Sequence, residues 1–376
     1  MTKPLPRAAY VHVPFCRHRC GYCNFTLVAG RDDLIESYLG AIERELSWLE
    51  TPRPVETLYI GGGTPSHLAQ DQLRRLFDLL HRWFPLESSY ELTVEVNPAD
   101  VNAELIEIIA EYGTTRVSLG GQSFDREKLA ILERDHSGDD IRTAIRKCQE
   151  TFAAVSLDLI FGTPGETLSK WRTDLRSALK LEPEHISTYG LTIERGTSFW
   201  GRLLKGNIKP LDEELEREMY ETAIDELTGA GFEHYEVSNF ARPGYRSRHN
   251  QVYWNGQPYF AVGPGASRYI DGRRETNHRS TTTYLQRVLN GYSPVAESEQ
   301  LDAESIARER LVFGLRQLKG IDRDAFSSET GFEIEYLVGR EVEKLVGLGI
   351  LEWADTRLKL TRNGLPISDS IWPELL

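Results

Sequence analysis

Three cysteines near the N-terminus constrain this chain more than any other feature. Cys16, Cys20 and Cys23 place three thiols within eight residues, in the spacing Cys-x3-Cys-x2-Cys. A cubane iron–sulfur cluster normally takes four cysteine thiolates. A cluster that is held by only three of them keeps one iron open for another ligand. The segment therefore predicts a cluster loop with one open iron.

Two other interpretations of these cysteines compete with the cluster. The three thiols and either His12 or His18 could form a tetrahedral zinc site, although structural zinc usually takes two ligand pairs separated by a longer loop. A disulfide framework is disfavoured because four cysteines in 376 residues are sparse and Cys148 lies far from the others. Cys148 falls on an amphipathic helical segment, where a free cysteine is expected to pack in the core.

Length and composition predict a protein with a large core and enough residues for two domains. The chain has 376 residues, of which 40% are hydrophobic and 27% charged, as in ordinary soluble proteins. No apolar run is long enough to span a bilayer, and residues 1–10 lack the hydrophobic core of a signal peptide. We therefore expect a reduced, cytoplasmic setting, which thiolate-held clusters also need.

The charge balance argues against nucleic acid as a partner. The net charge is −13, which repels a phosphate backbone unless the protein carries a local basic stripe. Arg242, Arg246 and Arg248 come nearest to such a stripe, but three arginines in a loop are usually just solvated.

Residues 8–191 alternate between short apolar runs and amphipathic stretches. The apolar runs predict strands at 8–13, 57–60, 91–96, 115–119, 155–160 and 185–191. Apolar residues at helical spacing predict helices over 34–49, 73–80, 103–112, 126–133, 139–152 and 167–180. Strands and helices in alternation imply parallel pairing with right-handed crossovers. Six units are too few to close a full barrel, so the expected α/β fold is a partial (β/α)6 barrel.

The character of the sequence changes near residues 195–215. A charged helix is expected at about 211–230, followed by a loop-rich, aromatic segment over 231–300. After residue 302 we expect two or three helices and a strand pair near 350–361, resembling a winged helix. Its acidic residues favour packing or protein interaction over DNA binding. The expected regions are a barrel over 1–205, an extension over 206–300 and a C-terminal α+β unit over 301–376.

The unusual motifs all follow predicted strands. Gly61-Gly62-Gly63 follows the second strand, Glu95 ends the third, Gln122 follows the fourth, and Asp158 ends the fifth. Ligands bind at the carboxyl ends of parallel strands, so these residues are expected to share one site. Alternatives remain open, since the glycines could form a tight turn and the acids could cap helices or form local salt bridges. Arg134 by itself could be a surface arginine.

A second motif, His249-Asn250-Gln251-Val252-Tyr253-Trp254, has the parts of a haem site. An imidazole can ligate iron, and aromatic rings can lie against the macrocycle. The three arginines at 242, 246 and 248 could pair with the propionates. On these residues alone, a loop histidine beside two packed aromatic side chains is the simpler interpretation.

Taken together, the motifs resemble the HemN/HemW branch of the radical S-adenosylmethionine (SAM) family over nearly the full length. The resemblance begins at Tyr10 and the cysteine loop, and it continues through the motifs Gly-Gly-Gly-Thr-Pro, Gln-Ser-Phe and Asp-Leu-Ile-Phe-Gly. Further along the chain it includes His185-Ile-Ser-Thr-Tyr, Tyr235-Glu-Val-Ser-Asn-Phe-Ala and His-Asn-Gln-Val-Tyr-Trp.

The resemblance implies a role for individual residues. Cys16, Cys20 and Cys23 would hold a [4Fe-4S] cluster whose open iron binds SAM through its methionyl amine and carboxylate. His249 would bind haem. The positions that match SAM contacts are Tyr10, Tyr22, Gly62, Gly63, Thr64, Glu95, Gln122, Arg134 and Asp158.

The resemblance also implies two alternative functions. The first is a haem chaperone that delivers haem to acceptor haemoproteins, including membrane-associated ones, and that could act as a homodimer. The second is an oxidoreductase in which SAM cleavage starts the oxidative decarboxylation of coproporphyrinogen III. Phe25 stands where the oxidase branch has a further cysteine, and the long N-terminal extension of that branch is absent ahead of the first strand. Both departures favour the chaperone, and whether the protein is an enzyme stays open.

Overall fold

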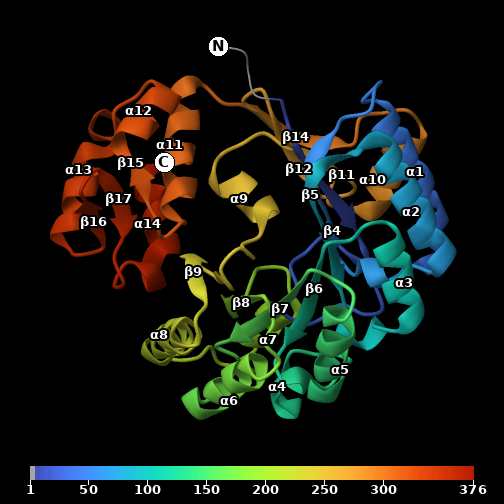
Figure 1. Cartoon of the computed structure of the whole chain (residues 1–376), viewed down its shortest axis with the longest axis horizontal. Helices are drawn as coiled ribbons and strands as arrows, with labels where there is room; N and C mark the ends of the chain where they lie inside the picture. The colour runs from blue at the N-terminus through green and yellow to red at the C-terminus, as the bar shows by residue number, and fades with distance from the viewer. Residues whose placement is uncertain (1–4) are drawn as a thin grey trace.

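A computed structural model describes residues 5–376, and residues 1–4 of the N-terminal segment considered above lie outside the described part. Its centre is a curved nine-stranded sheet in the order β11-β1-β4-β5-β6-β7-β8-β10-β9 (Figure 1). The parallel strands that follow one another along the chain are β1 (Ala8–Val13), β4 (Val55–Gly62), β5 (Leu86–Val96), β6 (Arg116–Gln122), β7 (Ala154–Phe161) and β8 (His185–Gly190).

Helices connect these strands and cover the outer face of the sheet. They are α1 (Ile35–Ser47), α2 (Gln70–Trp83), α3 (Ala103–Glu111), α4 (Arg126–Ile131), α5 (Gly138–Gln149) and α6 (Leu168–Leu179). Four of them begin where the side chain of Asn102, Asp125, Ser137 or Thr167 accepts a backbone N–H of the first turn. The six expected strands and six expected helices are thus confirmed as a partial (β/α)6 barrel.

Strand β4 shows how the alternation of its residues positions the site. Leu58 and Ile60 belong to the hydrophobic core, whereas Tyr59 between them lines the cavity inside the barrel. Successive side chains of a strand point to opposite faces, so the outward positions pack against helices and the inward positions can be polar. Parallel pairing, such as that of Tyr10 with Tyr59, brings the carboxyl ends of the strands to one edge.

The segment 206–300 is more regular than the sequence predicted. Helix α7 (Ser198–Leu204) precedes this segment. The elements of the segment are α8 (Glu213–Gly229), β9 (Glu233–Glu236), β10 (Asn239–Ala241), α9 (Arg248–Trp254), β11 (Phe260–Val262), β12 (Ser267–Ile270), β13 (Arg273–Asn277), α10 (Thr281–Leu289) and β14 (Val295–Gln300). β11 pairs in parallel with β1, and β10 pairs antiparallel with β8. The expectation of a loop-rich segment was wrong because strands this short give no readable periodicity. The division into regions 1–205, 206–300 and 301–376 stays a prediction, because the central sheet contains strands from both of the first two regions.

The last region forms a separate lobe in Figure 1. Its helices are α11 (Ala303–Leu315), α12 (Arg323–Thr330), α13 (Ile334–Gly347) and α14 (Ser368–Leu375), one more than the upper expectation. The expected strand pair is β16 (Leu351–Ala354) and β17 (Arg357–Leu360), and β15 (Ile321–Asp322) adds a third strand. Within residues 5–376, no helix is long and apolar enough to cross a membrane.

Candidate functional site

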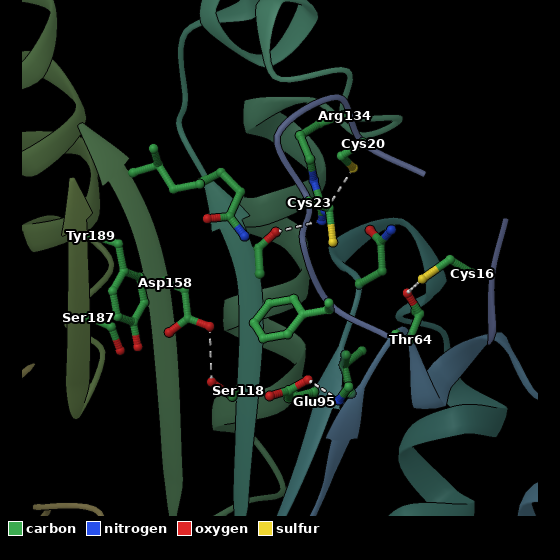
Figure 2. A pocket seen from close by; sticks show the side chains of 18 of the residues that line it. Cys16, Cys20, Cys23, Thr64, Glu95, Ser118, Arg134, Asp158, Ser187 and Tyr189 are labelled. Atoms are coloured by element: carbon green, nitrogen blue, oxygen red, sulfur yellow. Dashed lines mark hydrogen bonds between the residues drawn. The ribbon is translucent and has the colours of Figure 1, made fainter. Parts of the chain in front are cut away.

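The carboxyl ends of the parallel strands open into one cavity of about 530 Å³ (Figure 2). This volume lies within the usual range for pockets that hold one drug-sized ligand. The structure brings most of the sequence-predicted residues to this cavity: Cys16, Cys20, Tyr22, Cys23, Gly62, Gly63, Thr64, Glu95, Gln122, Arg134 and Asp158. Tyr10 and His249 do not line it.

The three thiols line the cavity on the segment that follows β1, where Cys16 ends the short strand β2 (Phe15–Cys16). Cys16 Sγ lies 3.3 Å from Thr64 Oγ1, and Cys20 Sγ accepts from Arg134 Nη1 at 3.7 Å. Burial raises the pKa of all three thiols, that of Cys16 to about 11. The thiols are therefore protonated at neutral pH without a cation, and metal binding must release their protons.

This donor set fits a cluster better than a single zinc ion. Among residues 5–376, no three His, Cys, Asp or Glu side chains converge closely enough to hold one metal ion. A cubane spreads its thiolates over different irons, so convergence on one point is not required. His12 does not line the cavity. His18 lines it, and its Nε2 contacts the Glu133 carbonyl and lies 3.7 Å from Cys20 Sγ. The structure therefore does not support the zinc alternative.

Cys148 lies on α5 and is buried in the hydrophobic core, away from the cavity. Burial raises the pKa of its thiol to about 12, so it is an inert, protonated group.

The glycines at the end of β4 allow the backbone to approach the cavity closely. Gly62 has φ of +114°, and a Cβ atom there would lie 2.6 Å from the His12 ring. A Cβ atom at Gly63 would lie 2.7 Å from the Phe15 carbonyl oxygen. Any side chain at these positions would displace its neighbours, so glycine is required for the shape of this rim. The turn and ligand interpretations of this motif are thus compatible.

Glu95 and Asp158 are two buried acids in the same cavity. Glu95 accepts from Tyr59 Oη at 2.7 Å and from the Gly62 N–H at 2.9 Å. Asp158 accepts from Ser118 Oγ at 3.3 Å. Burial raises the pKa of Glu95 to about 7 and that of Asp158 to about 6. Neither acid caps a helix or forms an ion pair within 4.0 Å in the described part of the chain, so both can accept an amine or hydroxyl ligand.

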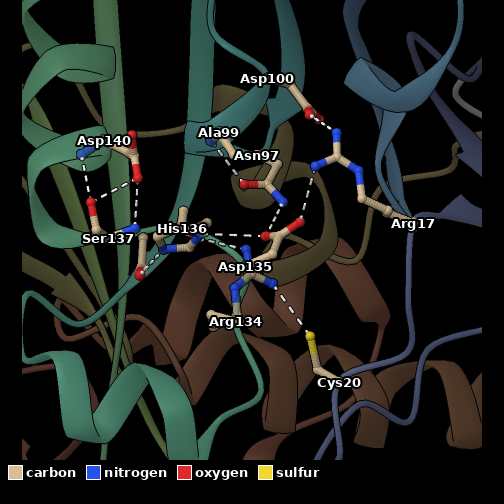
Figure 3. A network of polar contacts seen from close by, with 12 residues as sticks. Arg17, Cys20, Asn97, Ala99, Asp100, Arg134, Asp135, His136, Ser137 and Asp140 are labelled. Atoms are coloured by element: carbon tan, nitrogen blue, oxygen red, sulfur yellow. Dashed lines mark hydrogen bonds and ion pairs between the residues drawn. The ribbon is translucent and has the colours of Figure 1, made fainter.

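Arg134 joins the cysteine loop to the strand ends (Figure 3). Its guanidinium donates to the Gly120 carbonyl at 2.9 Å as well as to Cys20. The following residue, Asp135, accepts from Asn97 Nδ2 at 3.1 Å and lies 3.5 Å from Arg17. Arg134 is thus a buried cavity residue and not the surface arginine that its local sequence allowed.

Gln122 is held in a left-handed conformation with φ of +65°. The next two residues are anchored on Asp174, which accepts from Ser123 Oγ at 2.6 Å and from the Phe124 N–H at 2.7 Å. Lys128 Nζ donates to Asp174 at 3.1 Å. Such backbone strain persists only where the surroundings fix it, so this network positions Gln122 at the cavity.

Tyr10 lies on the same face of the sheet as its partner Tyr59 but does not line the cavity. Its hydroxyl donates to His12 Nδ1 at 3.0 Å, because His12 Nε2 donates to the Thr26 carbonyl at 2.6 Å. The rings of Tyr10 and Tyr59 are 6.0 Å apart. The implied contact of Tyr10 with SAM stays a prediction.

His249 is buried at the start of α9, with 1% of its surface exposed. Its Nδ1 lies 2.9 Å from Thr57 Oγ1 and its Nε2 lies 2.8 Å from Tyr253 Oη. Its ring also lies against Tyr59 at 5.2 Å. Burial lowers its pKa to about 3, so the imidazole is neutral. Both ring nitrogens are thus occupied by hydrogen bonds in this conformation.

Two functional positions escaped the sequence analysis. Tyr59 contacts both Glu95 and His249, and its inward position on β4 could have been read from its spacing to Gly61. Glu91 accepts from the His249 N–H at 3.0 Å, and no local signal connects residues so far apart.

Comparison with known proteins agrees with this site. Residues 10–178 match the radical SAM superfamily, and residues 301–367 match the HemN C-terminal domain. The Bacillus subtilis strain 168 protein named heme chaperone HemW is 33% identical over 375 residues, covering 98% of this chain and 99% of its own. The protein of the same name from Mycobacterium tuberculosis strain H37Rv is 34% identical over 379 residues, covering 99% and 95%.

A solved structure shows the same fold. Coproporphyrinogen III oxidase HemN from Escherichia coli superposes with a TM-score of 0.86 at 21% identity, covering 99% of this chain and 90% of the other. The curved parallel sheet and the three-cysteine loop define a radical SAM scaffold, whose cofactors are a [4Fe-4S] cluster and SAM. Within that superfamily the chain belongs to the HemW family.

Proposed function

We propose that this protein is a haem chaperone that binds haem through His249 and delivers it to acceptor haemoproteins in the cytoplasm or at a membrane, as a monomer or a homodimer. The observation that carries the proposal is the full-length similarity to proteins named heme chaperone HemW, at 33% and 34% identity. The three thiols would hold the cluster, and the cavity residues around Glu95 would hold SAM, which together supply single-electron chemistry when bound.

Helix α9 would have to open before His249 could ligate iron. A neutral imidazole ligates through the lone pair of one nitrogen, and both nitrogens of His249 are in hydrogen bonds. Tyr253, which bonds Nε2, lies one turn along the same helix, so the two side chains can move outward together. Because the ring is buried, haem binding through it requires a minor open conformation, and the apparent affinity falls in proportion to its population.

The test of this function is a haem titration of the cluster-loaded protein, followed by its Soret absorption. Substitution His249→Ala should weaken haem binding on the order of tenfold or more and shift the Soret band, because an axial ligand is lost. His136→Ala is a matched control, since His136 is also a buried neutral imidazole but does not lie on α9. Equal haem binding and equal spectra for wild type and His249→Ala would remove His249 from the proposal.

A second function, a radical SAM oxidoreductase, is supported by the shape of the cavity. The cavity continues into the barrel as far as Arg116 and His185. Thr93 Oγ1 and His185 Nδ1 are buried along it and have no hydrogen-bond partner among residues 5–376. A polar substrate would satisfy both groups. Anaerobic incubation with dithionite, SAM and coproporphyrinogen III, with detection of 5′-deoxyadenosine and decarboxylated porphyrin, distinguishes this enzyme from a chaperone.

A further inference from the structure

Phe25, two residues after the last cluster cysteine, is displayed to solvent at the mouth of the cavity. The residue is 66% exposed, and it lines the same cavity as the thiols. A single exposed apolar residue is common on protein surfaces and needs no explanation by itself. The segment that carries Phe25, residues 23–27, is unusual because it is fixed from several sides.

Arg19 holds both ends of this segment. Its Nη1 donates to the Cys23 carbonyl at 3.3 Å, and its Nη2 donates to the Leu27 carbonyl at 2.8 Å. One guanidinium thus bridges the carbonyl groups on either side of Phe25.

Residues from elsewhere in the fold hold the middle of the segment. Arg279, which follows β13, donates to the Asn24 carbonyl at 2.5 Å, and His12 donates to the Thr26 carbonyl at 2.6 Å. The backbone on both sides of Phe25 is therefore fixed before any ligand arrives. A ring presented on a fixed backbone loses less conformational entropy on binding than one on a mobile loop.

The two arginines also leave positive charge beside the backbone segment that carries Phe25. Neither Arg19 nor Arg279 has an acidic group within 4.0 Å in the part of the chain that the structure describes. Each guanidinium has five N–H donors, so bonds to one or two carbonyl oxygens leave donors free. The patch is thus an aromatic face with two unpaired guanidinium groups.

We propose that Phe25, Arg19 and Arg279 form an entry site for haem, with the ring against the macrocycle and the guanidinium groups on the propionates. This inference rests on the proposed function. A planar apolar ligand with two carboxylates matches the chemistry of the patch. Because His249 is buried, it cannot be the first residue that haem contacts, so haem must first bind at an exposed site. A net charge of −13 disfavours a large acidic protein as the occupant.

Titration of the full-length, cluster-loaded protein with haem and with iron-free protoporphyrin IX tests this site. Phe25→Ala should weaken the binding of both ligands about tenfold, because it removes a stacking surface and its buried area. Phe25→Trp should retain wild-type affinity, since it keeps an aromatic face. Tyr292→Ala is the matched control, because Tyr292 is 64% exposed and lies outside the cavity, and it should have no effect.

The charged half of the site has its own measurement. The double variant Arg19→Gln with Arg279→Gln should lose affinity for protoporphyrin IX but not for its dimethyl ester, which has no carboxylates. Iron and sulfide analysis of each variant shows whether the cluster loop is intact, and Arg→Lys at both positions should restore binding of the free acid.

The possible outcomes separate this site from the proposed function. If wild type and Phe25→Ala bind both ligands equally, the entry site is wrong. If wild type binds no haem, the proposed function itself fails. His249→Ala should change the binding of haem but not of protoporphyrin IX, which has no iron to ligate.

Discussion

At the scale of single residues, buried histidines decide how this protein responds to acid. His12, His136, His234 and His249 are largely buried, and burial lowers the pKa of each, to about 4 for the first three and to about 3 for His249. The native state therefore keeps these imidazoles neutral at a pH where the unfolded chain protonates them. Their contribution to stability is complete above the ordinary histidine pKa and is lost as the pH falls.

We expect the free energy of unfolding to fall between pH 7 and pH 4 for this reason. The pKa of His249 is near 6.5 in the unfolded chain and about 3 in the folded protein. Protonation of this residue in the unfolded chain alone should therefore lower the free energy of unfolding by about 2 kcal/mol at pH 5. His249→Asn should flatten this part of the pH profile by about that amount. Urea unfolding of the two proteins at pH 7 and pH 5 measures it, and parallel profiles would show that His249 does not titrate on unfolding.

At the scale of elements, a buried ionic network fixes the loop after β6. Lys128 on α4 bonds Asp174 on α6 and, at 2.5 Å, Glu166 before α6. Glu166 in turn accepts from the Thr163 N–H at 3.0 Å, in the loop after β7. The network thus joins two strand–helix loops at the edge where the cavity opens. Removal of one partner leaves the other charges buried without compensation.

Lys128→Met should destabilise the protein by about 3–5 kcal/mol, because Asp174 and Glu166 would then be buried and unpaired. The same variant should weaken SAM binding, since the left-handed Gln122 loses its anchored neighbours. Thermal unfolding and equilibrium dialysis with SAM measure the two effects. Lys170→Met, which removes a solvent-accessible lysine paired with Glu127 and Asp125, is the control and should leave stability nearly unchanged. Normal SAM affinity in a folded Lys128→Met protein would show that the network is only structural.

At the scale of the whole molecule, α9 lies between the barrel and the C-terminal lobe (Figure 1). Glu91 on β5 accepts from the N–H groups of Arg248 and His249 at 3.2 and 3.0 Å, and it pairs with Arg116 on β6 at 3.2 Å. From the other side, Gln317 donates to the Trp254 carbonyl at 3.2 Å. Both ends of α9 are therefore held by other parts of the chain.

Glu91→Gln should lower the free energy of unfolding by about 3 kcal/mol, because it leaves the buried Arg116 without its counter-charge. It should also raise the apparent affinity for haem, since a weaker anchor increases the population in which α9 is open. Urea unfolding and Soret titration measure these two changes. Glu36→Gln, which breaks an exposed pair with Arg75, should do neither. Weaker haem binding by Glu91→Gln would contradict the opening of α9.

Much of the fold and the centre of the site follow from local pattern. The strands β1 and β4 to β8 have apolar runs long enough to show their period, and the cysteine spacing is readable without any structure. Because parallel strands share an edge, the motifs after them had to meet, and Glu95, Asp158 and the thiols do line one cavity.

Tertiary contacts alone decided the rest. Strands β10 and β11 take their place in the central sheet by pairing with β8 and β1, distant partners that no short window reveals, and β9 joins the sheet through β10. The same holds for His249, whose burial depends on Thr57 and Glu91 more than one hundred and fifty residues away. Sequence by itself determined which groups this protein carries and the order of its main elements, because both depend on neighbours along the chain. Exposure, hydrogen-bond partners and pKa depend on neighbours in space, so only the folded structure could set Phe25 in solvent and His249 in the interior.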